Sequence, residues 1–334
     1  MRLANRISKG SIALAAVLIL AKGAYATSYV FTPLNDPSGI PGSTEAFGIN
    51  NSGDIVGTYF DSTGQHGFLY RTGTYTRIDV PSTPSQGVIG TTANAINASG
   101  NIAGQYTDAT VSEHGFVDKS GSFSQIDAPY PSAFNTGVNG INGTGDIVGT
   151  YVTSDAHGFL DKGGVFTKID VPFLGAYFTH ADGINDAGEI VGYYNVSGVA
   201  YGYLDQGGIF SPIAFPGATG TFANGINNTG EIVGFYTDAS GNSHGFLDVS
   251  GTYTSIDFPG AQNTLIYGIN DSGEITGTIF DTVPVTGDFF QGFLAVPNPN
   301  GASVPEPSGL WLIASGVVAL AFWRRFASSA FDRR

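Results

Sequence analysis

The chain has 334 residues, with 27 acidic and 13 basic side chains and a formal net charge of −14 at pH 7. This acidic balance repels phosphate backbones and excludes nucleic acid as a partner. The chain contains no Cys, which excludes a disulfide framework and a thiolate metal site.

The first expected element is a targeting segment, residues 1–26. Three basic residues precede an apolar run from Ile12 to Leu20, and Ala24-Tyr25-Ala26 supplies the small residues of a cleavage site. This order is typical of a secretory signal peptide that is removed after Ala26. An uncleaved anchor is the alternative, although the apolar run is short for a membrane span.

A repeated motif fills residues 27–297. A sequence close to Gly-Ile-Asn-x-x-Gly-Asp/Glu-Ile-Val-Gly-x-Tyr occurs six times, at spacings of 42 to 47 residues, and each copy is followed by a sequence close to His-Gly-Phe-Leu. Four short apolar runs per unit of about 44 residues are typical of a β-propeller blade. The first Ile of the motif is Ile49, Ile96, Ile141, Ile184, Ile226 and Ile269.

The two ends of the repeat region decide between a ring and its runner-up, a β-solenoid. The sixth copy stops after Gly292-Phe293-Leu294 and lacks the fourth run, while a similar run stands at the other end, from Phe31 to Pro37. A ring needs its last blade completed by the first strand, whereas a solenoid gains nothing from this arrangement. We therefore predict an all-β fold: a six-bladed propeller whose last blade is closed by the N-terminal strand.

Loop lengths within the repeats predict a binding face. The spacings between the first and second strands and between the third and fourth strands are constant, whereas the other two connections vary in length. In an up-and-down blade the variable loops share one face, and binding usually resides in loops on a rigid scaffold. The most unusual loop runs from Asp281 to Phe290, and its candidate binding residues are Asp281, Asp288, Phe289 and Phe290. A tolerated surface insertion is the alternative.

Other recurring polar residues have a structural interpretation. The Asn-x-x-Gly segments fit tight turns better than calcium loops or glycosylation sites. The repeated His residues lie on different blades, so we expect them to cap strands and predict no metal site. The fourth-strand residues Asp79, Asp127, Asp170 and Asp257 are expected to protect an edge strand from aggregation.

No catalytic residue is predicted. The chain has no Gly-x-Ser-x-Gly elbow, phosphate loop or His-Glu-x-x-His motif. A glycosidase needs two carboxylates facing one pocket, and a propeller axis could assemble them, but most acidic residues belong to repeated turns or edges. We expect no cofactor.

The C-terminal part contains three features in a fixed order. We expect residues 298–307 to form a linker that carries Pro305-Glu306-Pro307. We expect residues 308–325 to form a transmembrane helix that ends in Arg324 and Arg325, and residues 326–334 to form a cytoplasmic tail. This arrangement resembles the PEP-CTERM sorting signal of Gram-negative bacteria. The resemblance implies that a membrane-bound exosortase processes the chain, in organisms that make exopolysaccharide and biofilm matrix.

The repeats also resemble the HAF repeat family of extracellular bacterial proteins, which implies secretion and a repeat architecture without an established activity. The family's His-Ala-Phe motif corresponds here to His-Gly-Phe, at His66, His114, His157 and His244, with departures at Tyr201 and Gln291. We expect a non-enzymatic surface or matrix protein that binds exopolysaccharide or other surface proteins. A propeller hydrolase or lyase acting on extracellular polysaccharide is the alternative.

Overall fold

The computed structural model describes residues 28–82, 87–283 and 287–298, with the side chains of 282–289 outside this description. The described part is all-β and contains 24 strands and no helix. Its strands are rich in β-branched and aromatic residues. In the inner strand β2, partly exposed side chains alternate with buried ones along most of the strand. The all-β prediction is confirmed.

The strands form successive antiparallel groups of four, which we call repeats 1 to 6. Repeat 1 contains β2 (Ser43–Ile49), β3 (Ile55–Asp61), β4 (Gly64–Arg71) and β5 (Thr74–Ile78); repeat 2 contains β6 (Val88–Ile96), β7 (Ile102–Asp108), β8 (Glu113–Lys119) and β9 (Ser122–Ile126); repeat 3 contains β10 (Asn135–Ile141), β11 (Ile147–Val152), β12 (Ala156–Lys162) and β13 (Val165–Ile169). Repeat 4 contains β14 (Ala176–Ile184), β15 (Ile190–Val196), β16 (Val199–Asp205) and β17 (Phe210–Ile213); repeat 5 contains β18 (Gly220–Ile226), β19 (Ile232–Thr237), β20 (Ser243–Val249) and β21 (Thr252–Ile256); repeat 6 contains β22 (Thr264–Ile269), β23 (Ile275–Val283), β24 (Gly287–Pro297) and β1 (Tyr29–Leu34).

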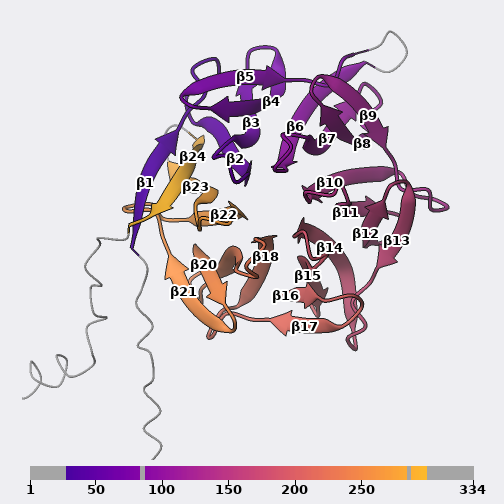
Figure 1. Cartoon of the computed structure of the whole chain (residues 1–334). Coiled ribbons are helices and arrows are strands. Elements are labelled where there is room, and N and C mark those ends of the chain that lie inside the picture. The colour runs from indigo at the N-terminus through magenta and orange to yellow at the C-terminus, as the bar shows by residue number, and fades with distance from the viewer. Residues whose placement is uncertain (1–27, 83–86, 284–286, 299–334) are drawn as a thin grey trace, which may run out of the picture. The chain divides into compact units, whose positions relative to one another are not determined.

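The repeats surround a central axis in a propeller-like arrangement (Figure 1), with the first strand of each repeat innermost. The N-terminal strand β1 pairs antiparallel with β24, from Tyr29 opposite Pro297 to Leu34 opposite Gly292. This pairing confirms that the N-terminal strand completes the sixth repeat. Strand β24 also makes a short parallel contact with β2, where Ser43 lies opposite Phe290. The two ends of the repeat region are therefore joined by backbone hydrogen bonds.

The Asn of each Gly-Ile-Asn motif forms the tight turn between the first two strands. In repeat 1, Asn50 Oδ1 accepts hydrogen bonds from the backbone N–H groups of Ser52 and Asp54, at 2.9 and 3.0 Å. The turn also needs a positive φ of 76° at Gly53, a conformation that suits glycine. The expected turn chemistry is therefore confirmed. We call the face that carries these turns the turn face and the opposite face the loop face.

The same asparagines also close a hydrogen-bonded ring around the axis. Each side-chain amide donates to the backbone carbonyl of the equivalent Asn in the next repeat, at 2.9 to 3.2 Å. The last amide, from repeat 6, donates to repeat 1 at 3.1 Å, so the circle has no open end. A solenoid would leave its terminal repeats far apart. The six residues are Asn50, Asn97, Asn142, Asn185, Asn227 and Asn270.

The space between neighbouring repeats is filled by the aromatic residue of the third strand. Phe68 is fully buried, and its ring lies against the second-strand residue Gly57. A Cβ at Gly57 would clash with the carbonyl oxygen of Glu45 and with this ring, so the Gly of Ile-Val-Gly permits the close approach. The equivalent fully buried rings are Phe116, Phe159, Tyr203, Phe246 and Phe293.

Within residues 28–82, 87–283 and 287–298, no helix is long and apolar enough to cross a membrane. The expected transmembrane helix at 308–325, the linker and the signal peptide lie outside the described residues.

Candidate functional site

A β-bulge interrupts the innermost strand of every repeat at the same place. In β2 the pairing with β3 skips from Ala46 to Gly48, which leaves Phe47 out of the ladder. A bulge bends its strand and redirects one side chain, and such bulges are frequent beside functional sites. All six bulged side chains line one cavity on the axis. They are Phe47, Asn94, Asn139, Asp182, Asn224 and Tyr267.

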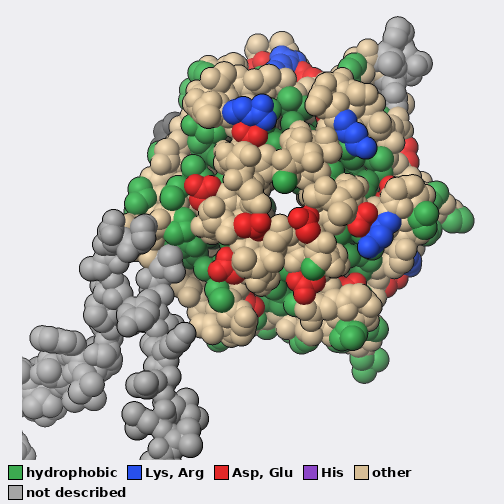
Figure 2. All heavy atoms as spheres, in the orientation of Figure 1, with side chains coloured by type: hydrophobic (Ala, Val, Ile, Leu, Met, Phe, Trp, Pro, Cys, Tyr) green, Lys and Arg blue, Asp and Glu red, His purple; other side chains and the backbone are tan. Residues whose placement is uncertain are grey.

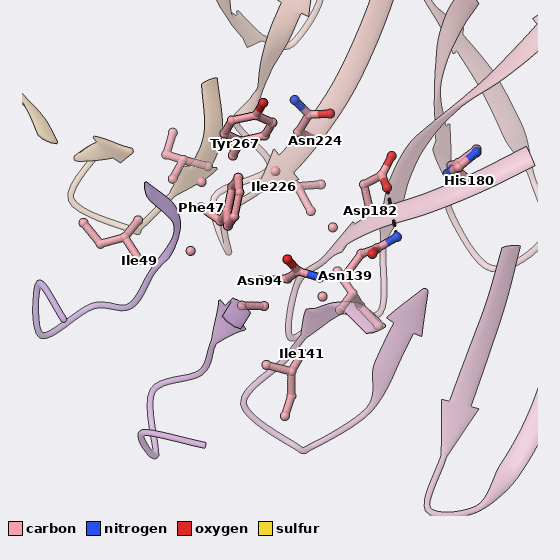
Figure 3. Close-up of a pocket in the computed structure, with 18 of the residues that line it drawn as sticks. Phe47, Ile49, Asn94, Asn139, Ile141, His180, Asp182, Asn224, Ile226 and Tyr267 are labelled. Atoms are coloured by element: carbon pink, nitrogen blue, oxygen red, sulfur yellow. Dashed lines mark hydrogen bonds between the residues drawn. The ribbon is translucent and has the colours of Figure 1, made fainter. Parts of the chain in front are cut away.

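The cavity, which we call the axial chamber, has a volume of about 470 Å³ (Figure 3). The first Ile of every motif lines both the chamber and a smaller pocket of about 80 Å³ at the turn face. The six isoleucines therefore separate the chamber from this turn-face pocket. Asp186 and Asp271 line the turn-face pocket. A space-filling view of one face shows a central opening with acidic side chains beside it (Figure 2).

One part of the chamber wall is aromatic. Phe47 and Tyr267 come from repeats 1 and 6 and meet edge to face, with ring centroids 5.1 Å apart. Phe222 stacks on Phe235 at 4.5 Å and meets Tyr193 edge to face at 4.9 Å. These rings are partly exposed to the chamber, although aromatic side chains usually lie in the core. They offer flat apolar surfaces to a ligand.

The other part of the wall is polar, and its amides are held in place by the neighbouring repeat. Asn94 Nδ2 donates to the carbonyl of Val138 at 2.9 Å, and Asn139 Nδ2 donates to the carbonyl of Ala181 at 3.1 Å. Asn224 Nδ2 donates to the carbonyl of Ile266 at 2.7 Å. The bonds from Asn94 and Asn224 each use one amide hydrogen, which leaves the second hydrogen and the amide oxygen of these side chains available to a ligand. Asn139 Nδ2 also lies 3.3 Å from Thr150 Oγ1 and 3.1 Å from Asp182 Oδ1, so its amide oxygen is the group that it offers to a ligand.

Asp182 occupies the same position in repeat 4 and has an unusual environment. Its Oδ1 accepts a hydrogen bond from Asn139 Nδ2 at 3.1 Å, as Figure 3 shows. Its Oδ2 is buried and has no hydrogen-bond partner among the described residues. Burial raises the pKa of this carboxyl to about 7, and the bond from Asn139 only partly opposes that effect.

His180 lies two residues before Asp182 on β14 and also lines the chamber. Its ring stacks on Tyr193, with centroids 4.4 Å apart and planes at 10°. Burial lowers the pKa of His180 to about 4, so the imidazole is neutral at pH 7. Asp182 is the one carboxyl in the described chamber wall, so the chamber does not supply the two carboxylates that a glycosidase requires.

The loop singled out from the sequence is an extension of a hairpin. Strand β23 extends into it as far as Val283 and strand β24 begins at Gly287, with Asp281 opposite Phe289 and Thr282 opposite Asp288. Phe290 stacks on Phe280 at 4.9 Å, and Asp281 Oδ1 accepts a hydrogen bond from the backbone N–H of Gln262 at 2.7 Å. The side chains of Asp288 and Phe289 lie outside the described residues.

Phe290 lies behind one residue of the chamber wall, Tyr267. Together with Phe280 and Glu45, it lines a cavity of about 180 Å³ that shares Tyr267 with the axial chamber. The hairpin and the chamber are therefore neighbours. Burial raises the pKa of Glu45 above its usual range.

The repeated His residues have partners that sequence reasoning did not assign. Each His Nδ1 pairs with the fourth-strand Asp thirteen residues later, at 2.9 to 3.2 Å. The pairs tie the third strand of a repeat to the end of its fourth strand, which gives both residues a structural role. They are His66–Asp79, His114–Asp127, His157–Asp170 and His244–Asp257. No group of three metal-ligating side chains occurs among the residues that the structure describes.

The sequence reasoning missed the chamber, but a signal for it was available. The residue before Gly/Ala-Ile-Asn is Asn in three repeats and Phe, Asp or Tyr in the other three, whereas the residues after it hardly vary. The second-strand residue between Gly and Tyr varies in the same way and supplies Gln105, Tyr193 and Phe235 to the chamber. Asp182 is an acidic residue at the first of these variable positions.

Comparisons with known proteins identify the sorting signal. The profile of the PEP-CTERM protein-sorting motif matches residues 303–325, which contain Pro305, Glu306, Pro307, Arg324 and Arg325. The chain therefore carries the signal of an exported protein that is anchored in the membrane during sorting by an exosortase. These five residues lie outside the described structure. No curated protein matches the chain.

Several solved structures resemble the described fold. Aleuria aurantia lectin in complex with Fucα1-6GlcNAc is 12% identical, with a TM-score of 0.48, over 79% of this chain and 99% of the lectin. A protein of unknown function from Dyadobacter fermentans is 11% identical, with a TM-score of 0.48, over 80% of this chain and 99% of that one. TolB from Acinetobacter baumannii is 12% identical, with a TM-score of 0.47, over 76% of this chain and 63% of that one.

Proposed function

We propose that this protein is a non-enzymatic binding protein of the cell surface or biofilm matrix of a Gram-negative bacterium, and that the axial chamber binds the end of an extracellular glycan. In this proposal the six repeats are the blades of a closed propeller of the HAF repeat type, spanning 27–297. We also propose a signal peptide at 1–26, a linker at 298–307, a membrane helix at 308–325 and a tail at 326–334.

The observation that carries the proposal is the pairing of aromatic rings with fixed amides around one chamber. A pyranose ring has an apolar face that stacks on aromatic side chains and an equatorial edge of hydroxyl groups that hydrogen-bond to amides. Phe47 and Tyr267 supply the first kind of surface, and Asn94, Asn139 and Asn224 supply the second. A site of this composition recognises a small polar ring without the paired carboxylates of a hydrolase.

A glycan array probed with the full-length chain, purified in detergent, tests the proposal. Wild type should bind a subset of glycans, and Phe47→Ala should weaken that binding by about tenfold or more, because it removes a ring face from the chamber. Phe60→Ala is the matched control, since Phe60 is an exposed ring outside the chamber lining. Equal binding by wild type and Phe47→Ala would contradict the assignment.

The hairpin residues Asp281, Asp288, Phe289 and Phe290 remain the second proposed binding element. The support for this element is that Phe290 lines a cavity that shares Tyr267 with the axial chamber. The variant Phe290→Ser, tested on the same array, distinguishes a site in the chamber from a site on the hairpin. Loss of glycan binding by Phe290→Ser, with binding retained by Phe47→Ala, would move the site to the hairpin.

A further inference from the structure

The charge of the axial chamber depends on one side chain. The lining contains the carboxyl of Asp182 and the imidazole of His180, and no Lys or Arg among the described residues. His180 is neutral at pH 7, because burial lowers its pKa to about 4. A ligand therefore meets a neutral or negative wall, which disfavours anionic sugars.

The other repeats show what the Asp replaces. At the equivalent position, Asn94, Asn139 and Asn224 each donate an amide hydrogen to a carbonyl of the next repeat. An ionised Asp has no hydrogen to donate, so repeat 4 lacks this bond, and the buried Oδ2 has no hydrogen-bond partner in the part of the chain that the structure describes. An unpaired buried acceptor is unfavourable for folding. The fold alone thus favours Asn at position 182, and the Asp points to a ligand that compensates for it.

The aromatic wall narrows the chemistry of that ligand. The faces of Phe and Tyr rings attract cations, most strongly where water is excluded. Tyr193 belongs to the same repeat as Asp182 and meets Phe222 of the next repeat edge to face. Phe47 and Tyr267 lie across the chamber from Asp182 (Figure 3). A positively charged group in the chamber is therefore placed between a carboxylate and aromatic side chains of the wall.

We propose that the axial chamber selects ligands that carry an ammonium group, of the amino-sugar class, and that Asp182 is the anionic partner of this group. The inference rests on the proposed glycan-binding function and names its ligand chemistry. The ammonium offers three hydrogens to the carboxyl oxygens and replaces the donor that Asn supplies in other repeats. Its charge also holds the Asp182 carboxyl in the ionised form.

Isothermal titration calorimetry on the full-length chain in detergent, at pH 7.5, tests the inference with four monosaccharides. They differ in one substituent: glucosamine carries an ammonium, N-acetylglucosamine a neutral amide, glucose a hydroxyl and glucuronic acid a carboxylate. We expect glucosamine to bind about tenfold tighter than glucose or N-acetylglucosamine, and glucuronic acid to bind most weakly.

Two variants assign the effect to Asp182. Asp182→Asn installs the residue of three other repeats, so the fold is expected to persist, and it should bring glucosamine to the affinity of glucose. Asp186→Asn is the matched control: it removes a carboxylate from the turn-face pocket, beyond the isoleucines, and should leave the preference unchanged. Equal affinities for glucosamine and glucose in wild type, or an unaltered preference in Asp182→Asn, would overturn the inference and leave the glycan site standing. Absence of binding for all four sugars would overturn both.

Discussion

Asp182→Asn should stabilise the protein, and the gain should depend on pH. Burial raises the pKa of Asp182 to about 7 from an ordinary value of 3.8. The folded state therefore holds a proton that the unfolded chain releases, so wild-type stability falls as pH rises from about 4 to about 7. Asn does not titrate, so the variant lacks this loss.

The size of the gain in unfolding free energy follows from the pKa shift of Asp182. About three pKa units, at about 1.4 kcal/mol each, set an upper limit of about 4 kcal/mol above pH 7. The effective dielectric constant of a protein is higher than that of a dry interior even at buried sites, so the expected value is smaller, about 1–2 kcal/mol. An added amide can also donate to the next repeat, as Asn139 does to Ala181, which contributes about 1 kcal/mol more.

Urea denaturation of wild type and Asp182→Asn at pH 5, 6, 7 and 8 measures the difference in unfolding free energy. We expect the gain to grow between pH 5 and pH 7 and then to level off. Asn224→Asp is the reciprocal variant: it removes the hydrogen bond to Ile266 and should cost about 1–3 kcal/mol. A gain that is absent at pH 8, or the same at pH 5 and pH 8, would refute the reasoning.

Three further perturbations test other parts of the molecule. Deleting residues 27–37 removes β1 and leaves β24 with an unpaired edge, so we expect loss of cooperative unfolding or aggregation by light scattering; an unchanged melting temperature would contradict ring closure. Replacing Pro305-Glu306-Pro307 by alanines should hold the chain in the inner-membrane fraction, and secretion equal to wild type would show that the motif is not the sorting signal. Phe290→Ser removes the stacking on Phe280 and should lower the melting temperature by a few degrees with matrix retention unchanged, whereas loss of retention at an unchanged melting temperature would make the hairpin a recognition element.

Much of the fold could be predicted from the sequence, because the period of the repeat and the apolar runs within it indicate how many strands each unit contains. The recurring Ile and Gly positions defined the strands, and the displaced run near Phe31 identified the strand that pairs with β24. The hairpin at Asp281 was expected as a loop, because its insertion breaks the repeat; the structure pairs it strand to strand.

The site was harder to predict for a physical reason. A bulge needs only one extra residue in a strand, and the side chain that it redirects cannot be recognised from local composition. Asn94 and Asn139 look like further turn residues in the sequence, and Phe47 looks like core. The variation at this position marks it as different from the rest of the repeat, and the pairing register then shows that these side chains leave the ladder and line the axial chamber. The His–Asp pairs were hidden for a related reason, since both residues repeat and each has a sufficient local explanation.

The pairing of β1 with β24 also sets an order of events during export. A chain that crosses the membrane from its N-terminus delivers Leu34 long before its partner Gly292. In repeats 1 to 5 the four strands follow one another in the sequence, so their contacts are local. Each of these repeats can therefore fold as it emerges from the membrane. Strand β1 must wait until the last strand has crossed. Folding of the ring is therefore completed only when translocation has nearly reached the sorting signal. A closed ring can form only after all six repeats have crossed the membrane.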